Sequence, residues 1–140
     1  MQLLNEELLN TWINLITTIN SDRLTPHMPL NESIILRILY HANGQQITAT
    51  KLCQELGIQK SQMNRILQNM EDKQLISRER SKDDKRVIII HLNSSQLTIF
   101  QAQHQEILAF IDKIIAKVGD DKIKQTITLL NEIIVASKGE

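Results

Sequence analysis

The chain has 140 residues, 41% of them apolar and only 3% aromatic, so it is long enough for one core but short for two independent domains. Because most apolar residues are Leu and Ile, we expect a mostly α (α+β) protein that forms one unit, 1–140. No apolar run approaches the roughly 18 residues of a membrane span. Residues 1–12 also lack a basic segment leading into an apolar one, so we expect a soluble cytoplasmic protein with no membrane partner.

The charge is unevenly distributed, although 16 basic and 16 acidic residues give a formal net charge of zero. Residues 51–86 contain nine basic and six acidic residues, so this stretch carries +3 and the rest of the chain −3. A net charge of zero argues against a polyanion partner, whereas the basic middle weakly favours nucleic acid.

Two helices are predicted in the first third of the chain. Apolar residues recur every three or four positions over 3–20, which is typical of an amphipathic helix. Pro26 and Pro29 interrupt any helix, and Asn31 is placed to cap the next one, which ends at the Asn-Gly pair 43–44. A short bridging strand is expected at 45–47.

The next segment predicts a helix-turn-helix. Thr48 is placed to cap a short helix, and Gly57 supplies the positive φ that ends it. A second helix begins around 59–61 and continues to about Lys73, with apolar residues on one face. Two short helices joined by so tight a turn must cross steeply, which is the helix-turn-helix arrangement.

The apolar period then changes from 3.6 to 2. Residues 75–80 alternate, and 87–92 form a β-branched run, so both are predicted strands. The residues between them, 81–86, are all polar, which indicates an antiparallel hairpin with an exposed charged tip, a wing.

The last third is predicted to return to helix. Residues 93–95 offer a cap, an apolar stripe follows to Val118, Gly119 breaks it, and Asp120 is placed to cap a final helix. These helices and the first one carry more apolar surface than a small winged domain covers, which favours self-association. We therefore interpret 1–30 and 94–140 as dimerisation helices and 31–93 as a winged helix-turn-helix DNA-binding region, with a two-fold dimer presenting two such units to DNA half-sites.

Three local motifs carry a family resemblance: residues 48–58 (TATKLCQELGI), 60–67 (KSQMNRIL) and 75–78 (LISR), followed by Asp84-Lys85-Arg86. Together with the order of elements, they resemble the multiple-antibiotic-resistance regulator (MarR) family of winged helix-turn-helix proteins. The resemblance implies that the second helix of the pair enters the major groove, that Arg86 on the wing reaches a minor groove, and that Asp84 orients Arg86.

The residue chemistry of the second helix and the wing suits DNA. Gln and Asn can pair with adenine and Arg with guanine, whereas Lys60 and Arg78 are placed for phosphates. The predicted contacts with double-stranded DNA are Lys60, Ser61, Gln62, Asn64, Arg65, Gln68, Arg78, Lys82, Lys85 and Arg86. Two residues depart from the family pattern: Gln59 stands where a Ser or Thr cap is expected, and Gln74 stands where the family usually has Gly.

Other candidate sites have simpler interpretations. Cys53 is interpreted as a core residue, with an oxidation sensor as the alternative. The four histidines, His27, His41, His91 and His104, lack ligand-like spacing, so neither a metal nor a cofactor is predicted. Trp12, Met28 and Leu30 are candidates for a pocket that binds a small lipophilic or phenolic effector, an effector class implied by the resemblance; structural packing is the alternative for Trp12.

The resulting hypothesis is a sequence-specific transcription regulator, a ligand-responsive repressor that acts as a homodimer on a pseudo-palindromic operator. The alternative is a dimeric winged-helix module that binds proteins and not DNA. An enzyme is not expected, because the sequence contains no Gly-rich phosphate loop, no carboxylates clustered with His and no nucleophile motif.

Overall fold

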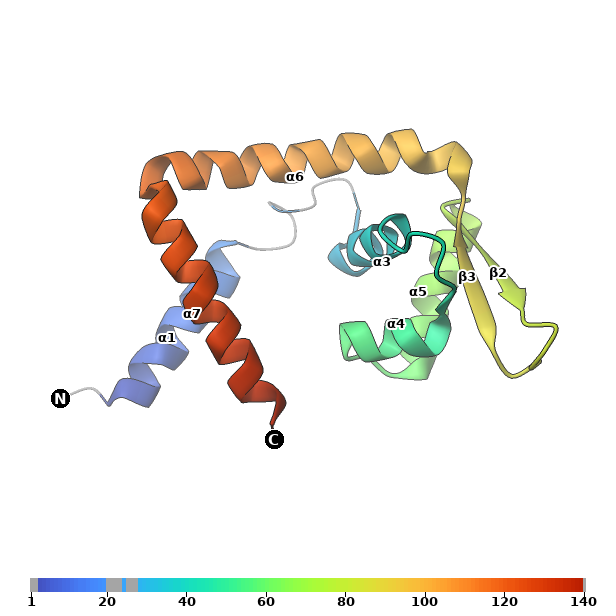
Figure 1. The fold of residues 1–140 in the computed structure, drawn as a ribbon, viewed down its shortest axis with the longest axis horizontal. Coiled ribbons are helices and arrows are strands. Elements are labelled where there is room, and N and C mark those ends of the chain that lie inside the picture. The colour runs from blue at the N-terminus through green and yellow to red at the C-terminus, as the bar shows by residue number, and fades with distance from the viewer. Residues whose placement is uncertain (1–2, 20–23, 25–27, 140) are drawn as a thin grey trace. The chain divides into compact units, whose positions relative to one another are not determined.

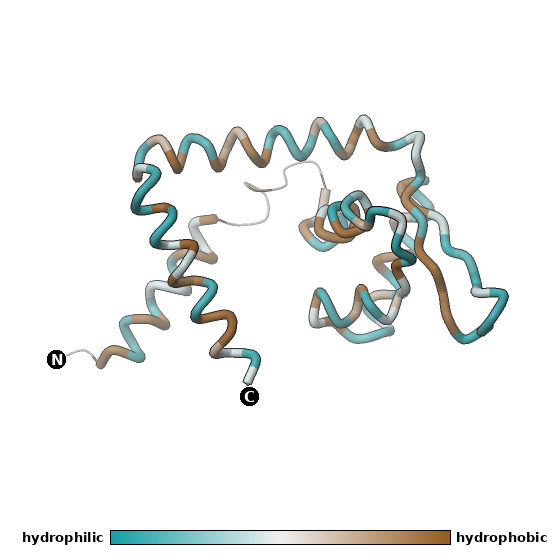
Figure 2. The backbone as a smooth tube through the Cα atoms, in the orientation of Figure 1, coloured by the Kyte–Doolittle hydropathy of each residue, from teal (hydrophilic) through white to brown (hydrophobic). Residues whose placement is uncertain are grey.

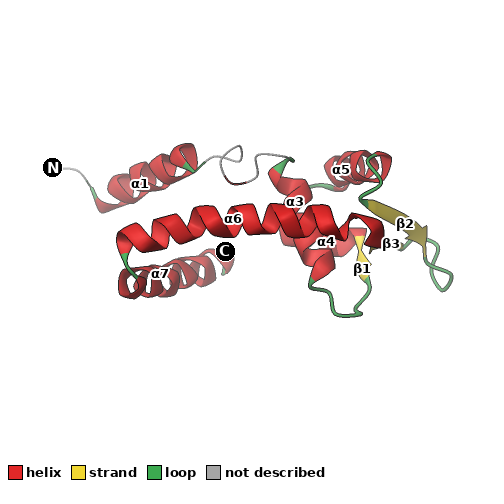
Figure 3. Cartoon of the chain, turned by 90° about the horizontal axis from the view of Figure 1, so that it is seen from above, coloured by secondary structure: helices red, strands yellow, loops and turns green. Residues whose placement is uncertain are grey.

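The computed structural model describes residues 3–19, 24 and 28–139, and it is mostly helical, as predicted. The helices and strands, in chain order, are α1 (Leu4–Thr18), α3 (Leu30–Tyr40), β1 (Ile47–Thr48), α4 (Ala49–Leu56), α5 (Lys60–Asp72), β2 (Ile76–Arg80), β3 (Ile88–Leu92), a 3-10 turn (Ser94–Gln96), α6 (Leu97–Val118) and α7 (Asp120–Lys138) (Figures 1 and 3). The three strands form one antiparallel sheet in the order β1-β3-β2. The mostly α, winged-helix class is confirmed.

The chain forms two compact units, Met1–Gln103 and His104–Glu140, and the boundary falls within α6. The first unit contains the helix-turn-helix, the sheet and the start of α6. Phe100 and Gln103 on α6 are buried in it, so the first residues of the predicted dimerisation segment 94–140 pack with α3 to β3, and we call the part from α3 to Gln103 the winged unit.

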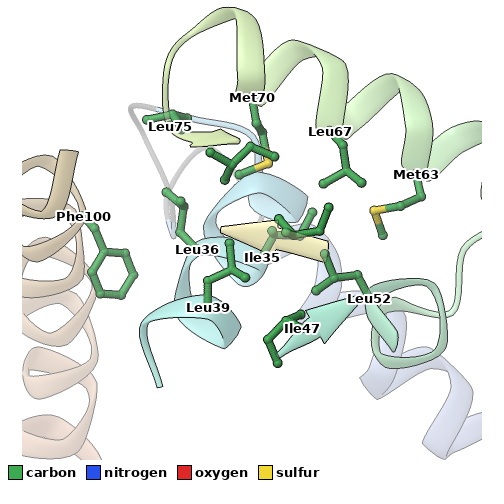
Figure 4. Close-up of a cluster of buried hydrophobic side chains, with 12 residues drawn as sticks. Ile35, Leu36, Leu39, Ile47, Leu52, Met63, Leu67, Met70, Leu75 and Phe100 are labelled. Atoms are coloured by element: carbon green, nitrogen blue, oxygen red, sulfur yellow. The ribbon is translucent and has the colours of Figure 1, made fainter. Parts of the chain in front are cut away.

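The core of the first unit collects apolar side chains from every element between α3 and α6. In Figure 4, Leu52 of α4 and Met63 and Leu67 of α5 point toward Ile35 of α3, and all four are at most 1% exposed. Phe100 closes the core from α6, with its ring 4.8 Å from that of Tyr40. Helix α5 therefore has one face fixed by packing, which leaves the opposite face to carry polar residues.

The predicted ends of α4 are confirmed. Thr48 Oγ1 accepts a hydrogen bond from the Lys51 amide at 3.1 Å, which caps the helix. Gly57 adopts φ +67° and its amide donates to the Cys53 carbonyl at 2.9 Å. The left-handed residue turns the chain into α5 within three residues, as a helix-turn-helix requires.

Both departures from the family pattern have structural consequences. Gln59 precedes α5 and makes no side-chain capping bond. Gln74 adopts φ +64°, the left-handed conformation that Gly would accept without strain. The corner is held by Asn93, whose Nδ2 donates to the Gln74 carbonyl at 2.7 Å and whose amide donates to the Leu75 carbonyl at 3.0 Å.

Two predicted caps are wrong. Helix α3 is capped by Pro29 rather than Asn31, because the Ser33 amide already donates to the Pro29 carbonyl at 3.1 Å. Helix α7 is capped by Gly119 rather than Asp120, because the Ile123 amide donates to the Gly119 carbonyl at 3.1 Å. Asn31 is the second residue of α3, and Asp120 is the first residue of α7. The Asp120 carboxylate still interacts favourably with the partial positive charge at the start of α7. The predictions that concern Pro26 and His27 lie outside the described residues.

Helices α1 and α7 contrast with the core because neither contains a buried residue. Apolar residues recur along both helices in Figure 2, whereas the wing tip is hydrophilic. In the part of the chain that the structure describes, no helix has the length and apolar character needed to cross a membrane.

Candidate nucleic-acid interface

The solvent face of α5 carries a row of polar side chains. Met63, Leu67 and Met70 face the core, so the 3.6-residue period turns the residues between them outward. Four of the predicted DNA contacts lie on this face, are exposed and make no side-chain hydrogen bond or ion pair within the described residues: Ser61, Gln62, Asn64 and Arg65. Their donors and acceptors are available to another molecule.

Lys60 is the first residue of α5 and is exposed. The first turn of a helix presents amide groups and a partial positive charge, which favours an anion. Because Gln59 supplies no capping side chain, no side-chain cap bonds to the first amide groups of α5. A phosphate beside Lys60 would satisfy both features.

The wing is a defined turn rather than a loose loop. Ser81 Oγ accepts bonds from the amides of Asp83 and Asp84 at 3.2 and 3.3 Å. The Val87 amide donates to the Asp84 carbonyl at 2.9 Å, which closes the turn. Arg80 Nη1 then donates to the Lys85 carbonyl at 2.6 Å, so the turn is also tied to β2.

Asp84 and Arg86 form a two-pronged pair at the wing tip. The Arg86 Nε and Nη2 donate to Asp84 Oδ1 and Oδ2 at 3.0 and 3.1 Å, and the Arg86 amide donates to Oδ1 at 3.0 Å. These hydrogen bonds hold the pKa of the Asp84 carboxyl below its usual range. The Arg86 side chain remains 91% exposed, so Asp84 restricts its direction without covering it. Lys82 and Lys85 are exposed beside it.

The solvent face of α5 and the wing border one cleft of about 910 Å³. Lys60, Asn64 and Gln68 line it from α5, and Arg78, Arg80 and Arg86 line it from the hairpin. In the sequence these basic and amide groups belong to separate elements. The structure brings them to a common concave surface.

Arg78 differs from Arg86 because its side-chain hydrogen bonds reach residues of another element, α5. Its Nη2 donates to Glu71 Oε1 at 3.0 Å and to Gln68 Oε1, and its amide donates to Glu71 Oε2 at 3.0 Å. Hydrogen bonding to the Arg78 side chain, the largest cause, lowers the pKa of the Glu71 carboxyl. The sequence analysis missed Glu71; its opposite charge to Arg78, across a tight corner, is the signal that could have revealed it.

The remaining candidates are dispersed. Met28 packs against the winged core, whereas Trp12 on α1 is 50% exposed, and the cleft beside the wing includes none of Trp12, Met28 and Leu30. Cys53 is half-buried and packs against the core. Among the described residues, no group of three or more His, Cys, Asp or Glu side chains could hold a metal ion.

Comparisons with known proteins agree with this geometry. A family model described as "Transcriptional regulator SarA/Rot" matches residues 21–103, more than half of the chain. The HTH-type transcriptional regulator MgrA of Staphylococcus aureus is 30% identical over 105 residues, which cover 74% of this chain and 67% of MgrA.

Solved structures share the fold. AbsC, a MarR family transcriptional regulator from Streptomyces coelicolor, aligns over 100% of this chain and 99% of its own with a TM-score of 0.83 at 16% identity. The MepR–DNA complex of S. aureus aligns over 96% of this chain and 99% of MepR with a TM-score of 0.75 at 16% identity. The predicted MarR-type fold is thereby confirmed. The chain belongs to the SarA/Rot family of transcriptional regulators, which share the MarR-type winged helix.

Proposed function

We propose that this regulator acts by binding double-stranded DNA through the cleft between α5 and the wing. The observation that carries the proposal is the joint exposure of unengaged polar side chains on α5 and of Arg86 on the wing, with Lys60, Asn64 and Arg86 lining one cleft. Helix α5 would enter the major groove, where Gln62, Asn64 and Arg65 can pair with base edges. Arg86 would enter the neighbouring minor groove, with Asp84 setting its direction.

The proposed phosphate contacts are Lys60 at the start of α5 and Lys82 and Lys85 on the wing. Ser61 lies beside Lys60 and can bond to either a base or a phosphate. The MepR–DNA complex supports this interpretation, since its protein has the same fold as this chain. For Gln68 and Arg78, which are engaged within the chain, we propose a different role below.

We propose that the protein works as a homodimer. Helices α1 and α7 expose large apolar side chains, including Leu8, Trp12, Leu130 and Ile134 at 46–50% exposure, and bury none. Contiguous apolar surface of this kind marks an interaction site on a soluble protein. A two-fold dimer is the commonest closed arrangement, and it would pair two winged units with a pseudo-palindromic operator.

The finer regulatory role is also a proposal. A repressor that occupies an operator can be released by a ligand only if the ligand prefers one of two dimer geometries. Trp12, Met28 and Leu30 provide apolar surface for such a lipophilic or phenolic effector. We propose that the protein acts in the cytoplasm.

The test measures affinity for a duplex recovered from a genomic fragment pool, at several salt concentrations. Arg65→Ala and Arg86→Ala should each weaken binding by roughly 1 to 3 kcal/mol if the arginine contacts a base edge. Lys82→Ala should instead lower the slope of log affinity against log salt by about 1. Arg37→Ala, which removes an exposed arginine from α3, is the matched control and should change neither quantity.

The alternative function, a winged module that binds only proteins, makes the opposite prediction. Wild-type protein would then show no salt-dependent affinity for duplex DNA even at low salt, since phosphate contacts must release counterions. Normal binding by both arginine variants would reject the assigned contacts while leaving DNA binding itself intact.

A further inference from the structure

The last turn of α5 is joined to the first half of β2 by a cluster of three side chains, Gln68, Glu71 and Arg78, which we name the corner clamp. Glu71 uses both carboxylate oxygens on Arg78, one on the guanidinium and one on the backbone amide, each at 3.0 Å. Gln68 accepts from the same guanidinium and donates from Nε2 to Asp72 Oδ1 at 2.9 Å. Both ends of the Gln68 amide are therefore engaged.

The corner clamp differs from the pair at the wing tip. Asp84 and Arg86 are two residues apart in one turn, and the Arg86 side chain is 91% exposed. Glu71 and Arg78 belong to different elements, and the Arg78 side chain is only 25% exposed. The first pair directs an exposed cation outward, whereas the second ties a helix to a strand and neutralises the cation.

This location decides what the clamp can control. The chain between α5 and β2 turns at Gln74, whose backbone is left-handed; its amide donates to the Glu71 carbonyl at 2.9 Å and its carbonyl accepts from Asn93. The side chain of Arg78 on β2 bonds to α5, and the wing continues from that strand. Side chains that contact DNA must be held to within about half an ångström, so a tie between their two supporting elements matters for binding.

We propose that Arg78 and Gln68 are positioning residues: with Glu71 they fix the spacing of α5 and the wing, and neither contacts DNA directly. The inference rests on the proposed DNA-binding function and assigns a role within it. It replaces the phosphate contact expected for Arg78 and the base contact expected for Gln68. Both side-chain bonds leave from one nitrogen, Nη2, at the far end of the guanidinium, and Lys does not reproduce them because its ammonium lies on a stem one bond shorter and lacks the planar guanidinium.

The test compares Arg78→Lys with wild type for binding to a mixed-sequence duplex of about 30 base pairs, which spans two half-sites. A phosphate contact tolerates Lys, because a point charge suffices there. A positioning role does not, so Arg78→Lys should lower affinity about tenfold with an unchanged salt slope. Lys82→Gln is the control for a phosphate contact and should lower the slope by about 1.

A double-mutant cycle adds an independent readout. If the corner clamp positions the wing, Glu71→Gln and Arg78→Gln each weaken DNA binding. The double variant should then bind DNA no worse than the single variant with the lower affinity. If Arg78 contacts phosphate, Glu71→Gln frees its guanidinium and strengthens binding. Gln68→Ala, which keeps the ion pair and spares the fold, should weaken binding about threefold and equally on duplexes of different sequence.

The outcomes separate this inference from the function on which it rests. Wild-type protein without salt-dependent binding overturns the proposed function and the inference together. Salt-dependent wild-type binding with near-normal affinity in Arg78→Lys, or a sequence-selective effect of Gln68→Ala, overturns the inference alone. Thermal melting of each variant verifies that a loss of affinity is measured on folded protein.

Discussion

Large apolar side chains are buried in the winged unit, whereas none is buried in the helices α1 and α7. Between α3 and β3, large apolar side chains meet in one core, and among the described residues no buried side-chain polar atom lacks a hydrogen-bond partner. In α1 and α7 the same residue types recur with helical period, yet none is buried. The helical spacing of apolar residues therefore does not show what a helix packs against. It shows only that one face of the helix is apolar and is stabilised by burial.

This difference distinguishes the part of the chain that folds on its own from the helices that we expect to form the dimer. The winged unit is complete within one chain, because its helices and sheet cover one another. An isolated amphipathic helix gains most of its stability from packing its apolar face. We therefore expect α1 and α7 to depend on a second copy, and the following experiments test the contrast from the largest effect to the smallest.

Charge placed on α7 should abolish the proposed dimer. Leu130→Glu with Ile134→Glu introduces two carboxylates on an apolar face, and burying them unpaired would cost several kcal/mol. Sedimentation velocity should show a dimer for wild type and a monomer for this variant. Lys122→Glu together with Lys124→Glu, on exposed polar positions of the same helix, is the charge control. A wild-type monomer would refute the dimer directly.

Core truncation should be costly at any protein concentration. Leu67 is 0% exposed in the winged core, so Leu67→Ala should lower the free energy of unfolding by roughly 2 to 5 kcal/mol. Leu129→Ala truncates a side chain that is 58% exposed on α7. Its effect should be smaller and should vanish on dilution if α7 is stabilised only by association. Urea unfolding at two protein concentrations measures both; a concentration-independent loss for Leu129→Ala would place α7 among the self-contained elements.

The local chemistry of the winged unit could largely be predicted from its sequence. Thr48 and Gly57 determine the ends of α4 through their own backbone and side-chain bonds, so the signal is contained in neighbouring residues. The caps at Asn31 and Asp120 were wrong because each helix begins where its first carbonyl acceptor lies, at Pro29 and Gly119, and cap preference shifts that point only weakly.

The candidate site divides along the same line. The outward face of α5 follows from its period, and the pairing of Asp84 with Arg86 spans only two residues. The bonds from Arg78 to Gln68 and Glu71 span ten and seven residues across a corner. Their formation depends on the angle between α5 and β2, which packing determines and no local pattern encodes.

The corner at Gln74 offers a smaller change, in the stabilising direction. Gln74→Gly should raise the free energy of unfolding by roughly 0.5 to 1 kcal/mol, because relief of the left-handed strain exceeds the added entropy of the unfolded chain. Gln54→Gly is the matched control: it makes the same replacement at an exposed position inside α4 and should destabilise by a similar amount. Two losses of equal size in urea unfolding would show that Asn93 already removes the strain at the corner.

The smallest effect is the pH dependence of the corner clamp. Hydrogen bonding to the Arg78 side chain holds the pKa of the Glu71 carboxyl below its ordinary value. A carboxyl whose pKa is lowered by folding contributes stability above its unfolded pKa, and this contribution is lost as the pH falls through its folded pKa.

The folded protein should therefore lose part of its stability below about pH 4. Glu71→Gln should be less stable at pH 7 and should lose less stability on acidification than wild type. Because Glu71 is partly exposed, solvent reduces the effect, and NMR titration of its side-chain carboxyl is the direct measurement. A titration midpoint at or above the unfolded value would mean that Arg78 does not hold the carboxylate in solution, and the corner clamp would then lack its ion pair.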